Sequence, residues 1–228
     1  RSSTGIEGNP LNYQEVALVL AGKKVSASQR FITEVLNYKK ALTYIEKQAK
    51  LESRFTLKNV LNIHRTVMRG LMSSQKVGKV RKTGIFVVDI KEGKEIVRYT
   101  GPEASEVADL ISDLFSWMSS VRGKLHDLLI AGILHYEFVS IHPFSDGNGR
   151  VSRLLTQQYL YHRGYGFRHV LVPDSYYFAD RQKYYEALNQ GPTYDRQRVA
   201  DLTPWLEYFM EGLASVARDV SEKITVEH

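Results

Sequence analysis

The segment from Ile141 to Arg153 contains residue types that could bind a phosphate and move a proton. It reads Ile-His-Pro-Phe-Ser-Asp-Gly-Asn-Gly-Arg-Val-Ser-Arg. Pro143 cannot continue a preceding helix, and glycines permit positive φ, so we expect a sharp turn between two helices. The turn would leave unpaired backbone N–H groups at the N-terminus of the second helix, where the helix dipole favours an anion. These groups, which would form a phosphate site, belong to Gly147, Asn148, Gly149 and Arg150.

Four side chains in the same segment add chemistry to this backbone site. His142 has an ordinary pKa near about 6.5 and can accept a proton at neutral pH. Asp146 lies at the mouth of the loop, where a carboxylate beside phosphates is the usual ligand of Mg²⁺. Arg150 and Arg153 are three residues apart on the second helix, so both guanidinium groups can reach one polyphosphate. This set predicts a nucleotide-dependent transfer to a hydroxyl group.

Each of these residues also has a plainer interpretation. An isolated loop histidine such as His142 commonly caps a helix, Asp146 fits the N-cap of the next helix, and Arg150 and Arg153 could be surface charges. We favour the chemical interpretation because all four fall within one short loop that already predicts an anion site.

The composition limits the classes of function. The chain has 228 residues, 43% of them hydrophobic, and a formal net charge of +6 with no cysteine. Without cysteine there is no disulfide framework, thiolate zinc site or cysteine nucleophile. No stretch approaches the roughly 20 apolar residues of a membrane span, so we expect a soluble, cytoplasmic chain that does not bind membranes. Because it begins with Arg1 rather than Met, we expect it to be part of a longer protein.

The positive charge is mild for a nucleic-acid binder and suits an anionic ligand such as a nucleotide. Its clearest concentration comprises Lys76, Lys79, Arg81 and Lys82. We interpret these four residues as a solvated loop rather than a phosphate-binding track, and nucleic acid as an unlikely partner.

Apolar residues recur mostly at the spacing of helices, which predicts an all-α fold. We expect a first helix capped by Asn9-Pro10 that runs through Leu20 to Gly22, and a second capped by Ser26 or Ser28. Further helices are expected after Thr56, after Pro102, from Leu125 to Ser140, after the motif loop, up to about Asn189, and from Thr203-Pro204 onwards.

One segment breaks the helical pattern. From Gly84 to Tyr99, apolar residues flank Lys91-Glu92-Gly93-Lys94, which predicts a β-hairpin. A lone hairpin is marginal in water, so it must pack on the helices or serve a ligand. With no repeat or linker, we expect a single domain over 1–228. It divides into an N-terminal segment at 1–22, the hairpin at 81–100 and a central helix-loop-helix at 125–163.

The motif resembles the signature of the Fic (filamentation induced by cAMP) family. That signature is H-x-F-x-[DE]-G-N-G-R-x-x-R, and His142 through Arg153 match it at every fixed position. The family places its motif between two central helices, downstream of a hairpin called the flap. The resemblance therefore implies a mainly helical Fic-like fold. It also implies a protein adenylyltransferase (AMPylator), which moves AMP from ATP onto a hydroxyl side chain of a target protein.

The resemblance implies a role for each matching residue. His142 would deprotonate the target hydroxyl, Asp146 would hold Mg²⁺, and Phe144 would anchor the loop in the core. Gly147, Asn148, Gly149 and Arg150 would bind the phosphates, and Arg153 would reach the γ-phosphate. The flap residues that would register the target segment are Ile85, Phe86, Val87 and Val88. The residues on the adenine side would be Tyr184, Tyr185 and Asn189. The acceptor would be a Tyr, Ser or Thr of a target protein, or of the chain itself.

The N-terminus carries a second resemblance. Ser3-Thr-Gly-Ile-Glu7-Gly8 is similar to the family's inhibitory motif, [ST]-x-x-x-E-[GN]. In such proteins the glutamate pairs with the second motif arginine, here Arg153, and takes the cation meant for the γ-phosphate. The resting enzyme would then be off. Glu7 could instead be an ordinary residue ahead of a Gly8 helix cap, or it could position water to remove AMP from modified targets.

Two alternatives remain to be weighed: a zinc site, and a regulator that binds nucleotide or nucleic acid without transfer chemistry. His64 and His135 lie on apolar helical faces and are expected to be packed core histidines, and no third ligand accompanies His135 and His142 for a zinc site. The chain could also be a nucleotide-gated or nucleic-acid-binding regulator without transfer chemistry. An intact His142 argues against that alternative, because a binding module needs no base there.

Overall fold

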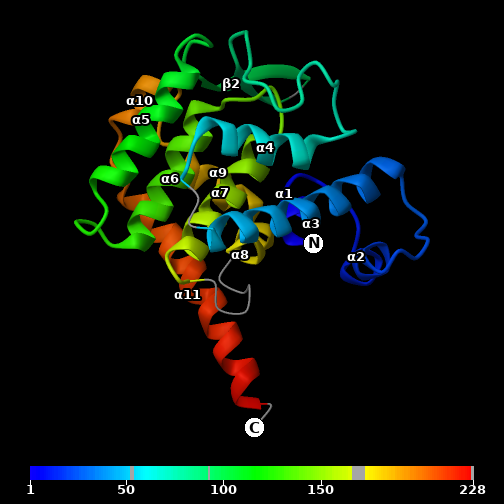
Figure 1. Cartoon of the computed structure of the whole chain (residues 1–228). Helices are drawn as coiled ribbons and strands as arrows, with labels where there is room; N and C mark the ends of the chain where they lie inside the picture. Colours follow the sequence, from blue (N-terminus) through cyan, green and yellow to red (C-terminus); the bar gives the residue numbers. More distant parts are fainter. Residues whose placement is uncertain (52–53, 92, 166–172, 227–228) are drawn as a thin grey trace.

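The computed structural model describes residues 1–51, 54–91, 93–165 and 173–226 (Figure 1). The fold class predicted from the sequence is confirmed, because the described chain is mainly helical with one two-stranded antiparallel sheet. The elements in chain order are α1 (Ser2–Ile6), α2 (Tyr13–Leu20), α3 (Gln29–Lys50), α4 (Leu57–Met68), β1 (Phe86–Lys91), β2 (Lys94–Thr100), α5 (Val107–Ser120), α6 (Asp127–Ile141), α7 (Asn148–His162), α8 (Asp174–Ala179), α9 (Arg181–Leu188), α10 (Tyr194–Arg198) and α11 (Thr203–Val226).

Helices α6 and α7 form the centre of the fold. Helix α6 is apolar on nearly all sides, and α7 packs against α6, α3 and α4. From Asn148 to Leu160 nearly every residue of α7 is buried, including polar ones such as Arg150 and Arg153. Figure 1 shows the other helices around this pair, with α11 extending away from it toward the C-terminus. A helix buried all round identifies the element on which the fold is assembled.

The hairpin forms where the sequence predicts it. Phe86 pairs with Thr100 and Asp89 pairs with Ile96, with an irregularity between Val87 and Val88. Gly93 in the turn has φ +74°, and the predicted turn residue Glu92 lies outside the described residues.

The base of the hairpin is attached to the helices, as a lone hairpin requires. Tyr99 donates its hydroxyl to the Ser140 carbonyl at the end of α6. The Thr100 N–H donates to the Pro192 carbonyl at 2.9 Å. The flap is therefore tied both to the central helix and to the loop that precedes α10.

The predicted start of the first long helix was wrong by a few residues. Helix α2 begins at Tyr13, and Asn12 is its cap, because Glu15 stands at the right spacing to complete a capping box. Asn9 is buried instead, and its side-chain amide donates to Glu34 Oε2 at 2.8 Å. Of the two residues predicted to cap the second helix, Ser28 holds the N-cap position of α3, without a side-chain cap bond. The cap predicted at Thr56 and the helix start at Thr203 agree with the structure.

The interpretation of the basic cluster was wrong for one residue. Lys76, Lys79 and Lys82 are exposed, but Arg81 is only 7% exposed. Its guanidinium donates to main-chain carbonyls near the C-terminus of α6, where the helix dipole favours a cation. Within the residues that the structure describes, no helix is both long enough and apolar enough to cross a membrane.

Candidate active site

His142 ends α6 in a left-handed conformation, with φ 49° and ψ 60°. It is the one non-glycine residue with positive φ among the described residues. Its Nδ1 lies 3.1 Å from the Val139 carbonyl, which can only accept, so Nδ1 carries the proton and Nε2 has a free lone pair. Burial lowers the pKa of His142 to about 4, so the imidazole is neutral at pH 7. The side chain is therefore ready to take a proton at Nε2.

The loop after His142 closes on itself and opens α7 without a side-chain cap. Gly147 is the N-cap at φ +86°, and a Cβ there would lie 2.8 Å from Met68 Sδ. The Asn148 amide bonds both main-chain groups of Phe144, each at 2.8 Å. The first backbone bond into the helix runs from Val151 to Gly147, which leaves the N–H groups of residues 148–150 without helical partners. The structure thus has the free amides that the sequence predicts for a phosphate site.

His64 supports this loop from α4, a role that sequence analysis missed. It is fully buried and its ring stacks on Phe144 at 3.7 Å. Its Nδ1 accepts from the Gly78 N–H at 2.8 Å, so Nε2 carries the proton and donates to the Asp146 carbonyl at 3.1 Å. The prediction of a packed core histidine is correct as far as it goes. A histidine on an apolar face gave no signal of its loop partner.

Arg150 lies outside the cavity and is held by two carboxylates. Its Nη1 lies 2.5 Å from Glu34 Oε1 on α3, and its Nη2 lies 3.0 Å from Asp146 Oδ1. The side chain is 5% exposed, whereas that of Asp146 is 46% exposed. Arg150 therefore orients the Asp146 carboxylate toward the solvent side of the loop. Glu34 was missed from the sequence, because nothing marks a partner 116 residues away.

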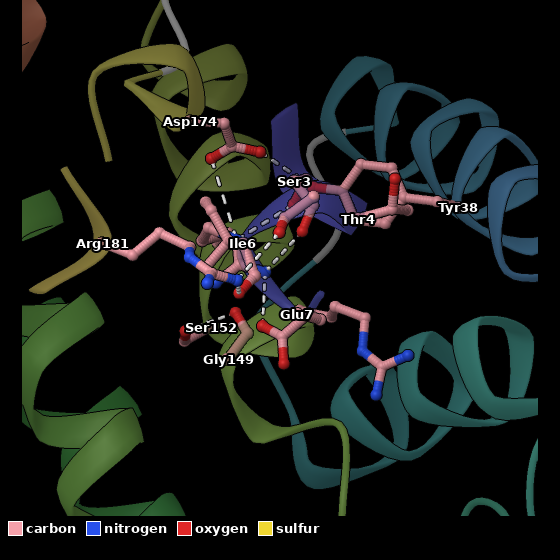
Figure 2. A network of polar contacts seen from close by, with 12 residues as sticks. Ser3, Thr4, Ile6, Glu7, Tyr38, Gly149, Ser152, Asp174 and Arg181 are labelled. Carbon is pink, nitrogen blue, oxygen red and sulfur yellow. Dashed lines mark hydrogen bonds and ion pairs between the residues drawn. The ribbon is translucent and has the colours of Figure 1, made fainter. Parts of the chain in front are cut away.

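Arg153 is held by the N-terminal segment. Its Nη2 lies 2.7 Å from Glu7 Oε1 and 3.0 Å from the Ser3 carbonyl, and its Nε donates to Ser3 Oγ at 2.9 Å. Asp174 Oδ1 lies 3.9 Å from Arg153 Nε, and Figure 2 shows Asp174 and Glu7 at opposite ends of this polar network. Burial alone would raise the pKa of Glu7, but Arg153 and Arg150 hold it below its usual value. The contact implied by the resemblance, between ionised Glu7 and Arg153, is present.

The Glu7 carboxylate lies on the N-terminus of α7. A Cβ built on Gly149 would lie 2.8 Å from Glu7 Oε1 and 3.2 Å from Arg153 Nη1. Figure 2 shows Glu7 reaching toward Gly149 at the start of that helix. A carboxylate therefore occupies the place where the free amides and helix dipole favour an anion.

These groups face one cavity of about 1040 Å³. The flap contributes Val87, Asp89 and Arg98 to its walls, and α9 contributes residues that include Arg181. The predicted site residues that line it are Glu7, Val87, His142, Asp146, Gly147, Asn148, Gly149, Arg153, Tyr184, Tyr185 and Asn189.

The remaining predicted site residues lie beside the cavity rather than in its walls. Ser3 and Arg150 are behind it, and Phe86 and Val88 are exposed on the flap. Ile85 precedes β1, where its carbonyl accepts from the Gly101 N–H.

The three residues predicted on the adenine side differ in how they are packed. Tyr184 is 1% exposed, stacks on Tyr177 at 4.4 Å and bonds His135, so its ring is part of the core. Tyr185 is 49% exposed, and Asn189 is exposed as well. Tyr185 and Asn189 are therefore the two that present free surface to a ligand.

The donor set fits a phosphate-bound magnesium ion. Among the described residues there is no group of three or more His, Asp or Glu side chains arranged to hold a metal by themselves. Asp146 is a single, partly exposed carboxylate beside an anion site. Mg²⁺ is commonly held by one or two carboxylates together with substrate phosphates and water.

Comparison with known proteins agrees with the motif. Residues 54–160 match the family model of the Fic/DOC family. A "Protein adenylyltransferase Fic" of Nematostella vectensis is 30% identical over 210 residues, which is 90% of this chain and 44% of that protein. One of Culex quinquefasciatus is 33% identical over 196 residues, covering 83% of this chain and 36% of that protein. The chain thus spans less than half the length of these curated relatives.

Solved structures give the same result for the fold. A Fic family protein from Desulfovibrio desulfuricans G20 has a TM-score of 0.79 and 30% identity, covering 97% of this chain and 63% of that one. A Fic domain containing signaling protein from Bacteroides thetaiotaomicron has a TM-score of 0.77 and 25% identity, covering 94% and 82%. With the motif, the hairpin and the two central helices all in place, residues 54–160 of the chain belong to the Fic/DOC family.

Proposed function

We propose that this chain transfers AMP from ATP to a hydroxyl group of a protein. The observation that carries the proposal is that the free Nε2 of His142 and the amide-lined start of α7 face the same cavity. The printed names of the relatives support it, since they describe protein adenylyltransferases. The acceptor is a Tyr, Ser or Thr side chain of a target protein, or of this chain itself.

The reaction balances with the groups present. The acceptor oxygen forms a bond to the α-phosphorus of ATP, and the bond from that phosphorus to the α,β-bridging oxygen breaks. The acceptor proton passes to His142 Nε2, and pyrophosphate leaves with the electron pair of the broken bond. His142 suits this step because its Nδ1–H donates to the Val139 carbonyl, which leaves Nε2 as the ring nitrogen that accepts the proton.

The phosphates are bound mainly by the N-terminus of α7. The N–H groups of residues 148–150 and the helix dipole face them, and Arg153 binds the γ-phosphate. Arg150 acts through Asp146, because its guanidinium is already bonded to two carboxylates. Asp146 would hold Mg²⁺, which when bound offsets the phosphate charge. Tyr185 and Asn189 contact the adenine.

Glu7 keeps this site inactive. Its carboxylate lies against Gly149 and Arg153, where the phosphates would have to lie. The negative charge of Glu7 at that position repels the triphosphate. Glu7 also pairs with Arg153, the cation that would otherwise bind the γ-phosphate. Activity therefore requires that Glu7 move, or that another residue replace it.

The flap receives the target segment. Strand β1 pairs with β2 on one side, and within the described chain its other edge pairs with no strand. An extended target segment can add to that edge by main-chain hydrogen bonds. Val87 lines the cavity, so pairing there brings an acceptor side chain toward His142.

A second activity uses the same residues. The Glu7 carboxylate is ionised and lines the same cavity as His142. It is therefore also suited to orient a water molecule that removes AMP from a modified target. Release of AMP from a pre-modified protein by the unchanged chain, and its loss in Glu7→Gly, is the result that supports this second activity.

The test is incubation of a cell lysate with Mg·ATP labelled at the α-phosphate. We expect Glu7→Gly to label proteins much more strongly than the unchanged chain, and Glu7→Gly/His142→Ala to give no labelling. ATP labelled at the γ-phosphate is the control: because protein kinases in the lysate also use it, its labelling should be the same with and without added Glu7→Gly. Labelling that depends on added Glu7→Gly and survives His142→Ala, or that appears with the γ-phosphate label, contradicts the proposal.

A further inference from the structure

Arg81 is a buried cation that pairs with main-chain carbonyls. Its guanidinium donates to the carbonyls of His142 at 2.9 Å, Thr83 at 2.9 Å and Pro102 at 2.6 Å. No carboxylate of the described chain lies within ion-pair distance of it. A buried charge is costly unless it is bonded, so these carbonyls must hold their positions around it.

The carbonyls that Arg81 contacts belong to two separate units. Thr83 lies just before β1 and Pro102 lies just after β2, so together they form the two legs of the flap. His142 belongs to the other unit, as the C-cap of α6. The Arg81 N–H adds a bond to the Pro143 carbonyl at 2.9 Å. One residue therefore joins the base of the flap to the loop that carries the imidazole.

The end of α6 needs such a partner. The last carbonyls of a helix have no bonds within it, and they carry the negative end of the helix dipole. His142 also has φ 49°, a conformation that residues other than glycine rarely adopt. A planar guanidinium with five N–H donors can bond several carbonyls at once in fixed directions, whereas a lysine ammonium cannot reproduce this arrangement.

We propose that Arg81 is a positioning residue that fixes the flap relative to His142, so that an acceptor hydroxyl held by the flap meets Nε2. The proposal rests on the proposed function, in which the flap carries the target and His142 the base. Arg81 lies outside the walls of the cavity, so it contacts neither nucleotide nor target. Its effect must therefore appear in transfer rather than in nucleotide binding.

The test uses Arg81→Lys and Arg81→Met in the Glu7→Gly background. Lys82→Met is the matched control, since Lys82 is the exposed neighbour. Incorporation of labelled AMP into lysate proteins should fall about 10- to 100-fold in Arg81→Lys, because a misplacement of about 1 Å costs that much. The KM for ATP and the affinity for a non-hydrolysable ATP analogue should stay within about threefold. Lys82→Met should match the Glu7→Gly parent.

Two results overturn the proposal while leaving the proposed function intact. One is an Arg81→Lys variant that labels proteins within about twofold of its parent. The other is an ATP-analogue affinity that falls as much as the labelling does, which indicates general loosening of the site.

A structural readout tests Arg81 even if the parent proves inactive. In NMR spectra, Arg81→Lys should shift the signals of both the His142 imidazole and the hairpin, and leave those of α3 in place. Unchanged His142 signals, or shifts spread over all helices, contradict the proposal that Arg81 joins the base of the flap to the loop that carries His142. A parent without any AMP incorporation would instead contradict the proposed function.

Discussion

The start of α7 carries two buried arginines whose carboxylate partners come from different elements. Arg150 meets Glu34 of α3 and Asp146 of its own loop. Arg153 meets Glu7, which follows the short α1. Arg150 and Glu34 lie behind the cavity wall, whereas Glu7 and Arg153 both line the cavity, as does the Asp146 carboxylate that Arg150 orients. The same kind of ion pair therefore holds the loop together in one place and blocks a binding site in the other.

The two clusters differ in what surrounds them as well as in what they face. The side chain of Glu34 is 10% exposed and that of Glu7 is 22% exposed. If Glu34 lost its arginine, its charge would remain in the interior. If Arg153 lost Glu7, it would still face the cavity. This contrast leads us to expect a stability effect at one cluster and an activity effect at the other.

The largest expected effect is on folding, from Arg150→Met. It should lower the free energy of unfolding by about 3 to 5 kcal/mol, because Glu34 is left as an unpaired buried charge. Urea denaturation measures the loss. The double variant Arg150→Met/Glu34→Met is the matched control and should recover most of it. A loss below about 1 kcal/mol is typical of a surface ion pair and would contradict the claim that the Arg150–Glu34 pair stabilises the fold.

The next effect is on activity, from Glu7→Gly. We expect AMP incorporation to rise about 10- to 100-fold, which corresponds to about 1.4 to 2.7 kcal/mol of relieved competition with the triphosphate. The free energy of unfolding should fall by less than in Arg150→Met, because Arg153 keeps its bonds to Ser3 and the nearby Asp174 carboxylate. Glu7→Gln is the control, since it keeps the shape and removes the charge. A stability loss as large as that of Arg150→Met would show that the Glu7–Arg153 pair, like the Glu34–Arg150 pair, serves mainly to stabilise the fold.

A third effect is the acid sensitivity of the core behind Arg153. Burial, and to a lesser extent the charge of Arg153, lower the pKa of His135 to about 3. Above pH 6.5 the histidine is neutral in both states, and its full contribution to stability is present. As the pH falls below 6.5 the unfolded chain binds a proton that the folded chain does not, so stability is lost progressively down to about pH 3.

From His135 alone we expect a loss of about 2 kcal/mol between pH 7 and pH 5. Urea denaturation at the two pH values measures it, and His135→Gln should make the difference smaller. His64 and His142 act in the same direction, because burial lowers the pKa of each to about 4. A difference between the two pH values that His135→Gln leaves unchanged would show that His135 is not buried in its neutral form.

The smallest effect is expected from Asn12→Ala. It removes the capping box of α2 and should cost about 1 kcal/mol of stability. It should leave AMP incorporation within about twofold, because α1 is held separately by α3, α7 and α8. Activation comparable to that of Glu7→Gly would show that the position of Glu7 depends on α2.

The sequence predicted the parts of this site that are encoded locally. The turn at Pro143 and Gly147, the free amides and the hairpin each follow from the residue types of a short, continuous stretch of sequence. The partners of those residues could not be predicted, because Glu34, His64 and Arg81 come from distant elements with no pattern to mark them. The five residues of α1 are too few to show a helical period. Asn9 and Asn12 are both good caps, and only the position of Glu15 separates them.

The most direct test of the account is a crystal structure of Glu7→Gly with magnesium and a non-hydrolysable ATP analogue. The account predicts the phosphates on the N–H groups of residues 148–150, with the γ-phosphate at Arg153 and the α-phosphorus open to an acceptor beside His142 Nε2. Phosphates bound elsewhere in the cavity, or an α-phosphorus facing away from His142, would contradict it.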